Sequence, residues 1–120
     1  MIALPNLLDG GWRDLAFLPF RPGIVIHRLY GDGSAAAAAV LRYEPGGAVP
    51  LHEHLGYEHV IVLHGAQEDE NGRHGAGAVI VNPPGSRHSV RSPEGCVALL
   101  IWEKPIRFVE PPVAGAGSAA

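Results

Sequence analysis

Short apolar runs, each ending after a few residues, dominate the pattern of the chain. Sixteen glycines and eleven prolines separate these runs, which leaves little room for long helices. The runs are rich in β-branched and aromatic residues, as is typical of strands, and they cover residues 24–30, 59–64, 78–81 and 97–102. Strand-like runs of this length between turn residues predict an all-β fold, either a sandwich or a barrel.

One segment, residues 34–47, has the composition of a helix. Five consecutive alanines follow Ser34; alanine is the best helix former and serine caps helices well. Gly33 and Pro45 nevertheless confine the segment to a short element, and an isolated helix of fewer than ~12 residues is marginal. We therefore predict a strand with small side chains here. A tight turn is predicted at Asn71 and Gly72, because both residue types tolerate positive φ.

The composition fits one compact domain and argues against several kinds of partner. The chain has 120 residues, of which 47% are apolar, so a sizeable core is expected. The net charge is −3 and the nine Lys and Arg residues are scattered, so we expect no nucleic-acid partner. Residues 96–102 form one of the longest apolar runs and are too few to cross a membrane. Because the N-terminus also lacks a basic leader, we expect a cytoplasmic protein with no membrane partner.

Three residues between positions 52 and 58 have the chemistry of metal ligands. His52 and His54 would point the same way from a strand, because successive side chains alternate between its faces. A turn at residues 55–57 would then bring Glu58 back beside the two imidazoles on a second strand paired with the first. Imidazole nitrogens with a carboxylate oxygen suit divalent iron, manganese, zinc or nickel. A fourth ligand is needed, and we expect His88, which follows the turn of residues 82–87, to face the other three across a closed barrel.

The remaining histidines are expected outside this group. His59 should alternate to the outer face of its strand, whereas His64 shares the parity of Glu58 but lies nearer the far end. Two more are expected at surface or hydrogen-bonded positions, namely His27 and His74. Cys96 is the only cysteine, so a disulfide within the chain and a cysteine-based zinc cluster are both excluded. We interpret it as a small apolar core residue, with a redox-active thiol as the alternative. The sequence leaves open whether four larger side chains line a pocket mouth: Arg42, Tyr57, Arg87 and Trp102.

Two spaced motifs in the chain resemble the signature motifs of the cupin superfamily. The first consists of Gly46, five residues, His52, one residue, His54, three residues, Glu58, six residues and Gly65; the second consists of Gly77, five residues, Pro83, one residue, Gly85, two residues and His88. Within that superfamily, the stretches PLHEHLGYE, DENG, NPPGSRH and SPEGC are similar to the cupin domain of ChrR-type anti-sigma factors and their single-domain relatives. One position departs from the pattern, since Ser92 stands where cupins usually have asparagine, which puts a local turn in doubt rather than the ligands.

The resemblance implies a double-stranded β-helix, or jelly-roll barrel, with one divalent metal ion (Fe, Mn, Zn or Ni) per chain. The implied ligands are His52, His54, Glu58 and His88. The expected organisation is one cupin domain over residues 1–110, with its core motifs at residues 46–92, and a flexible tail over residues 111–120. Nothing in the sequence resembles the separate N-terminal zinc domain with which ChrR holds its sigma factor, so inhibition by that route is not expected.

Two functions follow as hypotheses. The first is a metal-dependent, dioxygenase-like enzyme acting on a small organic molecule, and the alternative is a ChrR-like sensory or ligand-binding domain without turnover. No residue outside the four ligands stands out as a general base, so no catalytic residue is assigned. By analogy with other small cupins we expect a homodimer, for which the strand-like run of residues 12–20 offers an edge.

Overall fold

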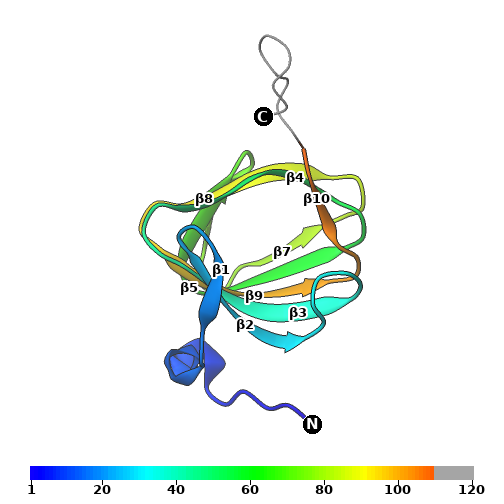
Figure 1. The fold of residues 1–120 in the computed structure, drawn as a ribbon. Helices are drawn as coiled ribbons and strands as arrows, with labels where there is room; N and C mark the ends of the chain where they lie inside the picture. The colour runs from blue at the N-terminus through cyan, green and yellow to red at the C-terminus, as the bar shows by residue number, and fades with distance from the viewer. Residues whose placement is uncertain (110–120) are drawn as a thin grey trace.

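The computed structural model describes residues 1–109 as a curled antiparallel β-structure whose strands wrap around a common interior (Figure 1). Two short 3-10 helices, η1 (Leu7–Asp9) and η2 (Gly11–Asp14), precede the strands. The strands are β1 (Leu18–Arg21), β2 (Ile24–Tyr30), β3 (Ala37–Tyr43), β4 (Gly47–His54), β5 (Glu58–Asp69), β6 (Gly72–Gly75), β7 (Val79–Asn82), β8 (Arg87–Ser92), β9 (Cys96–Trp102) and β10 (Ile106–Phe108). The all-β prediction is confirmed, and among these residues no helix is long and apolar enough to cross a membrane. The tail predicted at residues 111–120 lies outside the described residues.

One long strand joins the two sides of this structure. The strand order is β1-β2-β3-β9-β5-β8-β4-β10, with β6 and β7 also paired to β5. The first half of β5 pairs with β7 and β9, and its second half pairs with β6 and β8. The β5–β6 hairpin turns at Asn71, as predicted, where the backbone N–H donates to the Asp69 carboxylate (2.8 Å). Residues 12–20, predicted as one strand-like run, instead divide between η2 and the edge strand β1.

The alanine-rich segment is a strand, as predicted. β3 pairs along its whole length with β9 and along most of it with β2. Both of its faces are covered: Ala39 and Leu41 pack into the interior, while Val40 packs on the outer face against Trp12 of η2. Two flanking ladders and burial on both faces therefore outweigh the helix propensity of alanine, which is below 1 kcal/mol per residue relative to most other residues.

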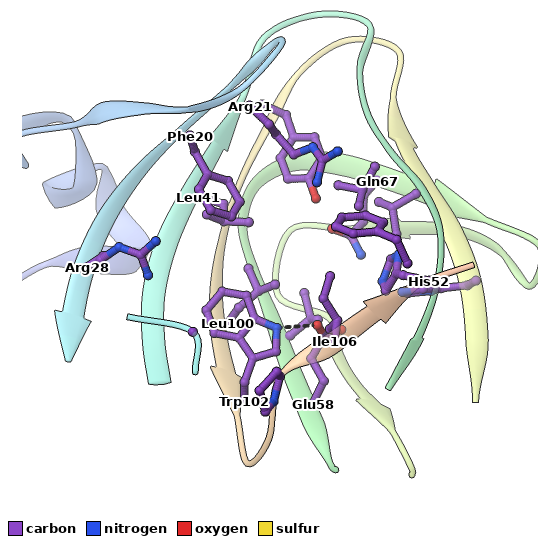
Figure 2. A pocket seen from close by; sticks show the side chains of 18 of the residues that line it. Phe20, Arg21, Arg28, Leu41, His52, Glu58, Gln67, Leu100, Trp102 and Ile106 are labelled. Carbon is purple, nitrogen blue, oxygen red and sulfur yellow. Dashed lines mark hydrogen bonds between the residues drawn. The ribbon is translucent and has the colours of Figure 1, made fainter. Parts of the chain in front are cut away.

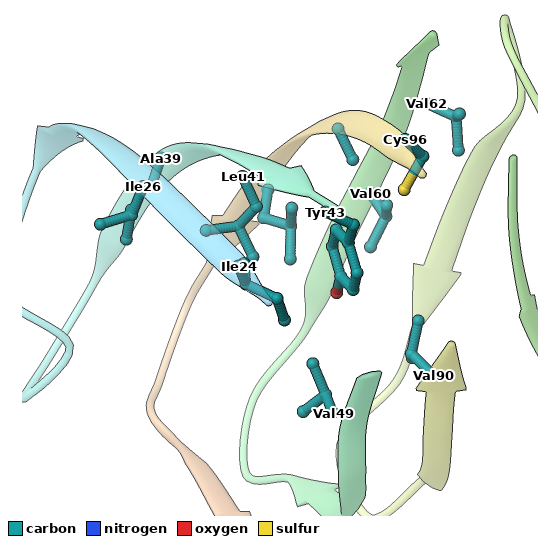
Figure 3. Close-up of a cluster of buried hydrophobic side chains, with 12 residues drawn as sticks. Ile24, Ile26, Ala39, Leu41, Tyr43, Val49, Val60, Val62, Val90 and Cys96 are labelled. Carbon is teal, nitrogen blue, oxygen red and sulfur yellow. The ribbon is translucent and has the colours of Figure 1, made fainter. Parts of the chain in front are cut away.

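The main apolar core lies inside the curled sheet. Its buried side chains come from β2, β3, β4, β5, β8 and β9 (Figure 3), and they include Ile24, Tyr43, Val62 and Cys96. Burying a side chain of this size contributes about 1.5–3 kcal/mol. Cys96 is 2% exposed within this core, as its interpretation as a small apolar residue required, and burial raises the pKa of its thiol.

The strand pairing around the histidines differs from the prediction. We predicted that the strand holding His52 and His54 pairs with the one that opens at Glu58. In the structure β4 pairs with β8 and β10, and β5 begins on the other side of the interior, paired with β7 and β9. Residues 55–57 thus carry the chain across the interior from β4 to β5 instead of closing a hairpin between them.

A β-bulge in the middle of β5 changes which side chains face inward. The pairing with β9 shifts between Val62 and His64, so Leu63 packs against Trp12 on the outer face and His64 lies exposed beside the same indole. Strict alternation, which placed His64 on the side of Glu58, is therefore wrong beyond the bulge. Gly65 follows with φ of 70°, and a Cβ there would lie 2.3 Å from the carbonyl oxygen of Gly95, so the bend requires glycine.

Candidate metal centre

Three imidazoles converge from two neighbouring strands. β4 and β8 pair so that His52 lies directly opposite His88, and His54 lies two residues further along β4 on the same face. The ring centroids are 4.7–5.0 Å apart, and one nitrogen from each ring lies within 4.8 Å of the other two. His88 is therefore the cross-strand neighbour of His52, not a ligand facing it across the barrel as predicted.

Each of the three rings is oriented by a hydrogen bond from Nδ1. His52 Nδ1 donates to the carbonyl of Pro50 (2.8 Å). His54 Nδ1 lies 3.1 Å from the carbonyl and 2.9 Å from the hydroxyl of Ser86. His88 Nδ1 lies 3.1 Å from Oδ2 of Asp69. When Nδ1 carries the proton, the Nε2 lone pair is free to bind a metal, and such a partner behind each ring is the usual arrangement of metal-binding histidines.

The opposite nitrogens are buried without a protein partner. Among residues 1–109, Nε2 of His54 and Nε2 of His88 are the buried side-chain polar atoms that have no hydrogen-bond partner. Leaving such atoms unpaired costs about 1–3 kcal/mol each. Burial, with the nearby His88 ring, lowers the pKa of His52, which favours the neutral form that a metal requires. The orphaned nitrogens and the neutral ring together fit a bound metal ion.

The side chain of Glu58 points into the same interior from the start of β5, opposite β4 and β8. Its Oε1 lies 3.2 Å from Nε2 of His54, but the two atoms are not aligned as a hydrogen bond, as expected when both present lone pairs to a common point. Asn82 donates to Oε1 (3.0 Å) and the Trp102 indole donates to Oε2 (2.7 Å). Burial raises the pKa of Glu58, but the contacts with His54 and Trp102 and the nearby His52 outweigh it and hold the pKa below its ordinary value. The structure therefore groups the three predicted histidines tightly and places Glu58 beside one of them, His54.

Several residues that support the site were missed by the sequence reasoning. The carboxylate of Asp69, whose side chain is 1% exposed, accepts from His88 through one oxygen and from His74 through the other (3.1 Å each). Ser86 and Asn82 hold His54 and Glu58 as described above. The DENG and NPPGS stretches contain these residues and were interpreted only as turns. Their spacing gave no indication that the polar side chains point back toward the ligands.

Ser92, which stands where cupins usually have asparagine, still secures its turn. Its hydroxyl donates to the carbonyl of Ala66 (2.7 Å), and its own carbonyl accepts from the N–H of Gly46 (2.8 Å) and of Gly95 (3.3 Å). A buried hydroxyl thus replaces the amide without leaving a backbone group unpaired.

The other singled-out residues mostly lie outside the site. His59 is exposed on the outer face, as predicted. His27 bonds to the carbonyl of Ala16 (2.9 Å), as expected of a satisfied surface histidine. Trp102 lines the interior cavity, whereas the three other pocket-mouth candidates are exposed elsewhere: Arg42 over Trp12, Arg87 beside Glu53, and Tyr57 on the outer surface.

A cavity opens onto the histidines. It has a volume of about 190 Å³. His52 and Glu58, both labelled in Figure 2, lie on its wall, and His88 also lines it. Most of the remaining wall is aliphatic or aromatic, with residues such as Leu41, Val49, Val60, Val90, Leu100 and Ile106. A small organic molecule would therefore meet apolar walls and the candidate metal position together.

Comparison with known proteins agrees with this arrangement. The family described as the ChrR cupin-like domain matches residues 11–107. The anti-sigma-E factor ChrR of Cereibacter sphaeroides is 35% identical over 105 residues, which are 86% of this chain and 46% of ChrR, so the chain spans about half the length of that relative. The crystal structure of Rhodobacter sphaeroides SigE in complex with the anti-sigma ChrR matches with a TM-score of 0.65 at 30% identity, over 75% of this chain and 49% of that one.

A more distant likeness concerns the fold alone. An acetylacetone dioxygenase from Acinetobacter johnsonii has a TM-score of 0.71 at 18% identity, over 78% of this chain and 71% of that one. The jelly-roll barrel implied by the two sequence motifs is thus confirmed. With the family match extending over most of its length, the chain belongs to the ChrR cupin-like domain family of cupins.

Proposed function

We propose that this protein binds one divalent metal ion per chain through His52, His54, Glu58 and His88. The observation that carries the proposal is the set of three buried imidazoles whose Nδ1 atoms are all hydrogen-bonded and whose opposite nitrogens converge. Glu58 would add a carboxylate that Asn82 and Trp102 hold in place. Three imidazoles and one carboxylate suit iron, manganese, zinc or nickel, and a six-coordinate ion would keep two positions open.

We further propose that the site acts on a small organic molecule in the manner of a metal-dependent dioxygenase. The metal, when bound, would supply a Lewis acid with open positions toward the cavity. The protein contributes the apolar wall that excludes water and the buried partners that keep the ligands oriented. The fold shared with an acetylacetone dioxygenase supports this proposal by analogy only.

The alternative is a sensory domain that binds a ligand at the metal without turnover. The specific observation in its favour is the 35% identity to the anti-sigma-E factor ChrR. A crystal structure shows an anti-sigma ChrR in complex with SigE. In that case the partner is a protein, and binding at the cavity would change the surface that the partner contacts.

Metal content and oxygen uptake distinguish the dioxygenase-like enzyme from the sensory domain. The protein is purified without added metal or chelator, its metals are measured by inductively coupled plasma mass spectrometry, and oxygen uptake is followed with a panel of diketones. Near-stoichiometric iron or manganese with oxygen uptake that His54→Ala abolishes supports the enzyme. Stoichiometric zinc without uptake supports the sensor. Protein that neither contains nor takes up metal contradicts both.

Two further expectations stay proposals. A homodimer could form through β1, the edge strand on which Leu18 and Phe20 are 68% and 41% exposed, and light scattering of the eluting protein gives the mass that checks it. We also propose a cytoplasmic location, which fractionation of the source cells tests.

A further inference from the structure

We propose that the cavity recognises a small oxo acid, whose carboxylate pairs with Arg21 while its other oxygens reach Gln67 and the metal position. This inference rests on the proposed metal-dependent function and names the class of ligand that the site takes. It is carried by the polar and charged groups of the cavity wall that the metal centre does not use.

The first of these groups is Gln67. It is 3% exposed and lines the cavity together with His88, and no hydrogen bond of residues 1–109 involves its side-chain amide. The hydroxyl of Tyr43, 5% exposed on the same wall, is likewise without a hydrogen bond within residues 1–109. Neither group is among the buried atoms of residues 1–109 without a partner, so the polar atoms of both side chains stay accessible from the cavity. A ligand in the cavity can therefore bond to them.

The second group is the guanidinium of Arg21. It lies 4.6 Å from the centre of the Phe108 ring, on the wall of the same cavity, and Figure 2 shows it beside the space that His52 and Gln67 also face. It forms no ion pair with any carboxylate of residues 1–109, whereas Arg73, Arg87, Arg91 and Arg107 all do. An arginine held against an aromatic ring without a carboxylate partner is suited to an anion.

The charges of the cavity wall favour the same conclusion. Its charged residues are Arg21, Arg28, Asp32 and Glu58. Hydrogen bonds from the hydroxyl and N–H of Ser34 lower the pKa of Asp32, and the nearby Arg28 adds a smaller effect. The charges of Arg28 and Asp32 therefore offset each other. A divalent ion beside the single carboxylate of Glu58 leaves positive charge, and Arg21 adds to it. The cavity is therefore positive at two separate places, one at the ligands and one at Arg21.

The ligand class follows from these two places. A cavity of about 190 Å³ suits a compact molecule rather than a polymer. Such a molecule needs oxygens for the metal position and a separate carboxylate for Arg21. An oxo acid with a carbonyl next to or near its carboxylate has both, whereas a neutral diketone lacks the group that Arg21 would bind.

A matched pair of ligands tests the inference. 2,4-Dioxopentanoate and hexane-2,4-dione share the diketone, but a carboxylate in the first replaces an ethyl group in the second. Their affinities for the metal-loaded protein are compared by isothermal titration calorimetry. We expect the acid to bind about tenfold more tightly, as one charge-assisted hydrogen bond supplies. Equal affinities, or no binding of the acid, would overturn the inference.

Three variants assign the preference to its residues. Arg21→Gln should reduce the preference to about twofold or less with unchanged metal content, while Arg73→Gln, which removes an equal charge outside the cavity, should keep it. Gln67→Leu keeps the side-chain volume and should weaken both ligands together, because the amide contacts an oxygen they share. If Arg21→Gln folds normally and still binds the acid about tenfold more tightly than the diketone, the inference is wrong.

Repeating the comparison on chelator-treated protein separates this inference from the proposed metal site. Without metal both affinities should fall, but the acid should still bind more tightly, because Arg21 remains. If the protein takes up no metal yet shows the Arg21-dependent preference, the metal-dependent function is wrong and the anion specificity stands. If the metal loads fully but neither the metal-loaded nor the chelator-treated protein prefers the acid, the anion specificity is wrong and the metal site stands.

Discussion

The interior contains two regions that differ in whether their buried atoms find partners within the protein. The apolar core around Ile24, Ile26 and Val62 is buried against other side chains of the protein itself. The histidine cluster around His52, His54 and His88 is buried as deeply, at 1–3% exposure, but keeps nitrogen atoms without protein partners. The first region stabilises the fold, whereas the second costs free energy unless something binds to it. Stability and binding should therefore separate when each region is changed alone.

Removing two ligands should have the largest effect. In the double variant His52→Ala/His88→Ala, two of the four proposed ligands are gone, so we expect the bound metal to fall from near one per chain to background, because the remaining pair cannot complete a site. Mass spectrometry of the purified protein measures this. His59→Ala, an exposed histidine on the outer face, serves as the matched control and should keep its metal. Unchanged metal content in the double variant would falsify the ligand assignment.

Truncating the apolar core should show the opposite behaviour. Ile24 is 1% exposed, and Ile24→Ala should lower the free energy of unfolding by about 2–5 kcal/mol through lost burial and a new cavity. Urea titration followed by circular dichroism gives the value, and the metal content per folded chain should not change. Val79→Ala, at a 63% exposed position, should cost no more than about 0.5 kcal/mol. A large loss of metal in Ile24→Ala would mean that the two regions are not separable.

A change behind the ligands should have an intermediate effect. Asp69→Asn removes the negative charge that faces Nδ1 of His88, which makes that imidazole a poorer ligand. We expect the metal affinity to fall by about ten- to hundredfold, measured by competition with a chromogenic chelator. His74→Ala removes the other side-chain partner of Asp69 and should change the affinity much less. Equal effects of the two variants would show that Asp69 acts on the hairpin rather than on His88.

The smallest effect is expected at Glu53, between the two ligands in sequence but on the outer face. Hydrogen bonds from Arg107 and Arg87 lower the pKa of Glu53. A carboxyl with a lowered folded-state pKa stabilises the protein above its ordinary pKa of 4.5, and this contribution is lost as the pH falls through the lowered value. Glu53→Gln should therefore be slightly less stable at neutral pH, with the difference vanishing in strong acid and in high salt. Its metal content should equal that of the unchanged protein; a loss would place Glu53 in the site.

How far the sequence predicts the structure differs between the same two regions. The strands and the three clustered histidines could be predicted, because alternation and motif spacing are local properties of the chain. The strand pairing could not be predicted. Whether β4 pairs with β5 or with β8 depends on contacts between distant segments, and the local sequence pattern is compatible with either pairing. The bulge at His64 was missed because it is a feature of the pairing with β9, which the sequence of β5 alone does not reveal. Asp69 and Ser86 were missed because turn residues carry no periodic signal for where their side chains point.

The bulge in β5 gives this domain a particular sensitivity to changes of length. Glu58 and Gln67 are nine positions apart and would point to opposite faces of an unbroken strand, yet both line the cavity, because the pairing with β9 takes in one extra residue between them. Deleting His64 would leave the two residues eight positions apart and still facing inward, whereas inserting one residue before the bulge would turn Gln67 and Asp69 outward together. One insertion there would remove the cavity amide and the support of His88 at once, although no proposed ligand had been altered. Among related genes, the length of this strand should vary less than the identity of the residues at its bulge.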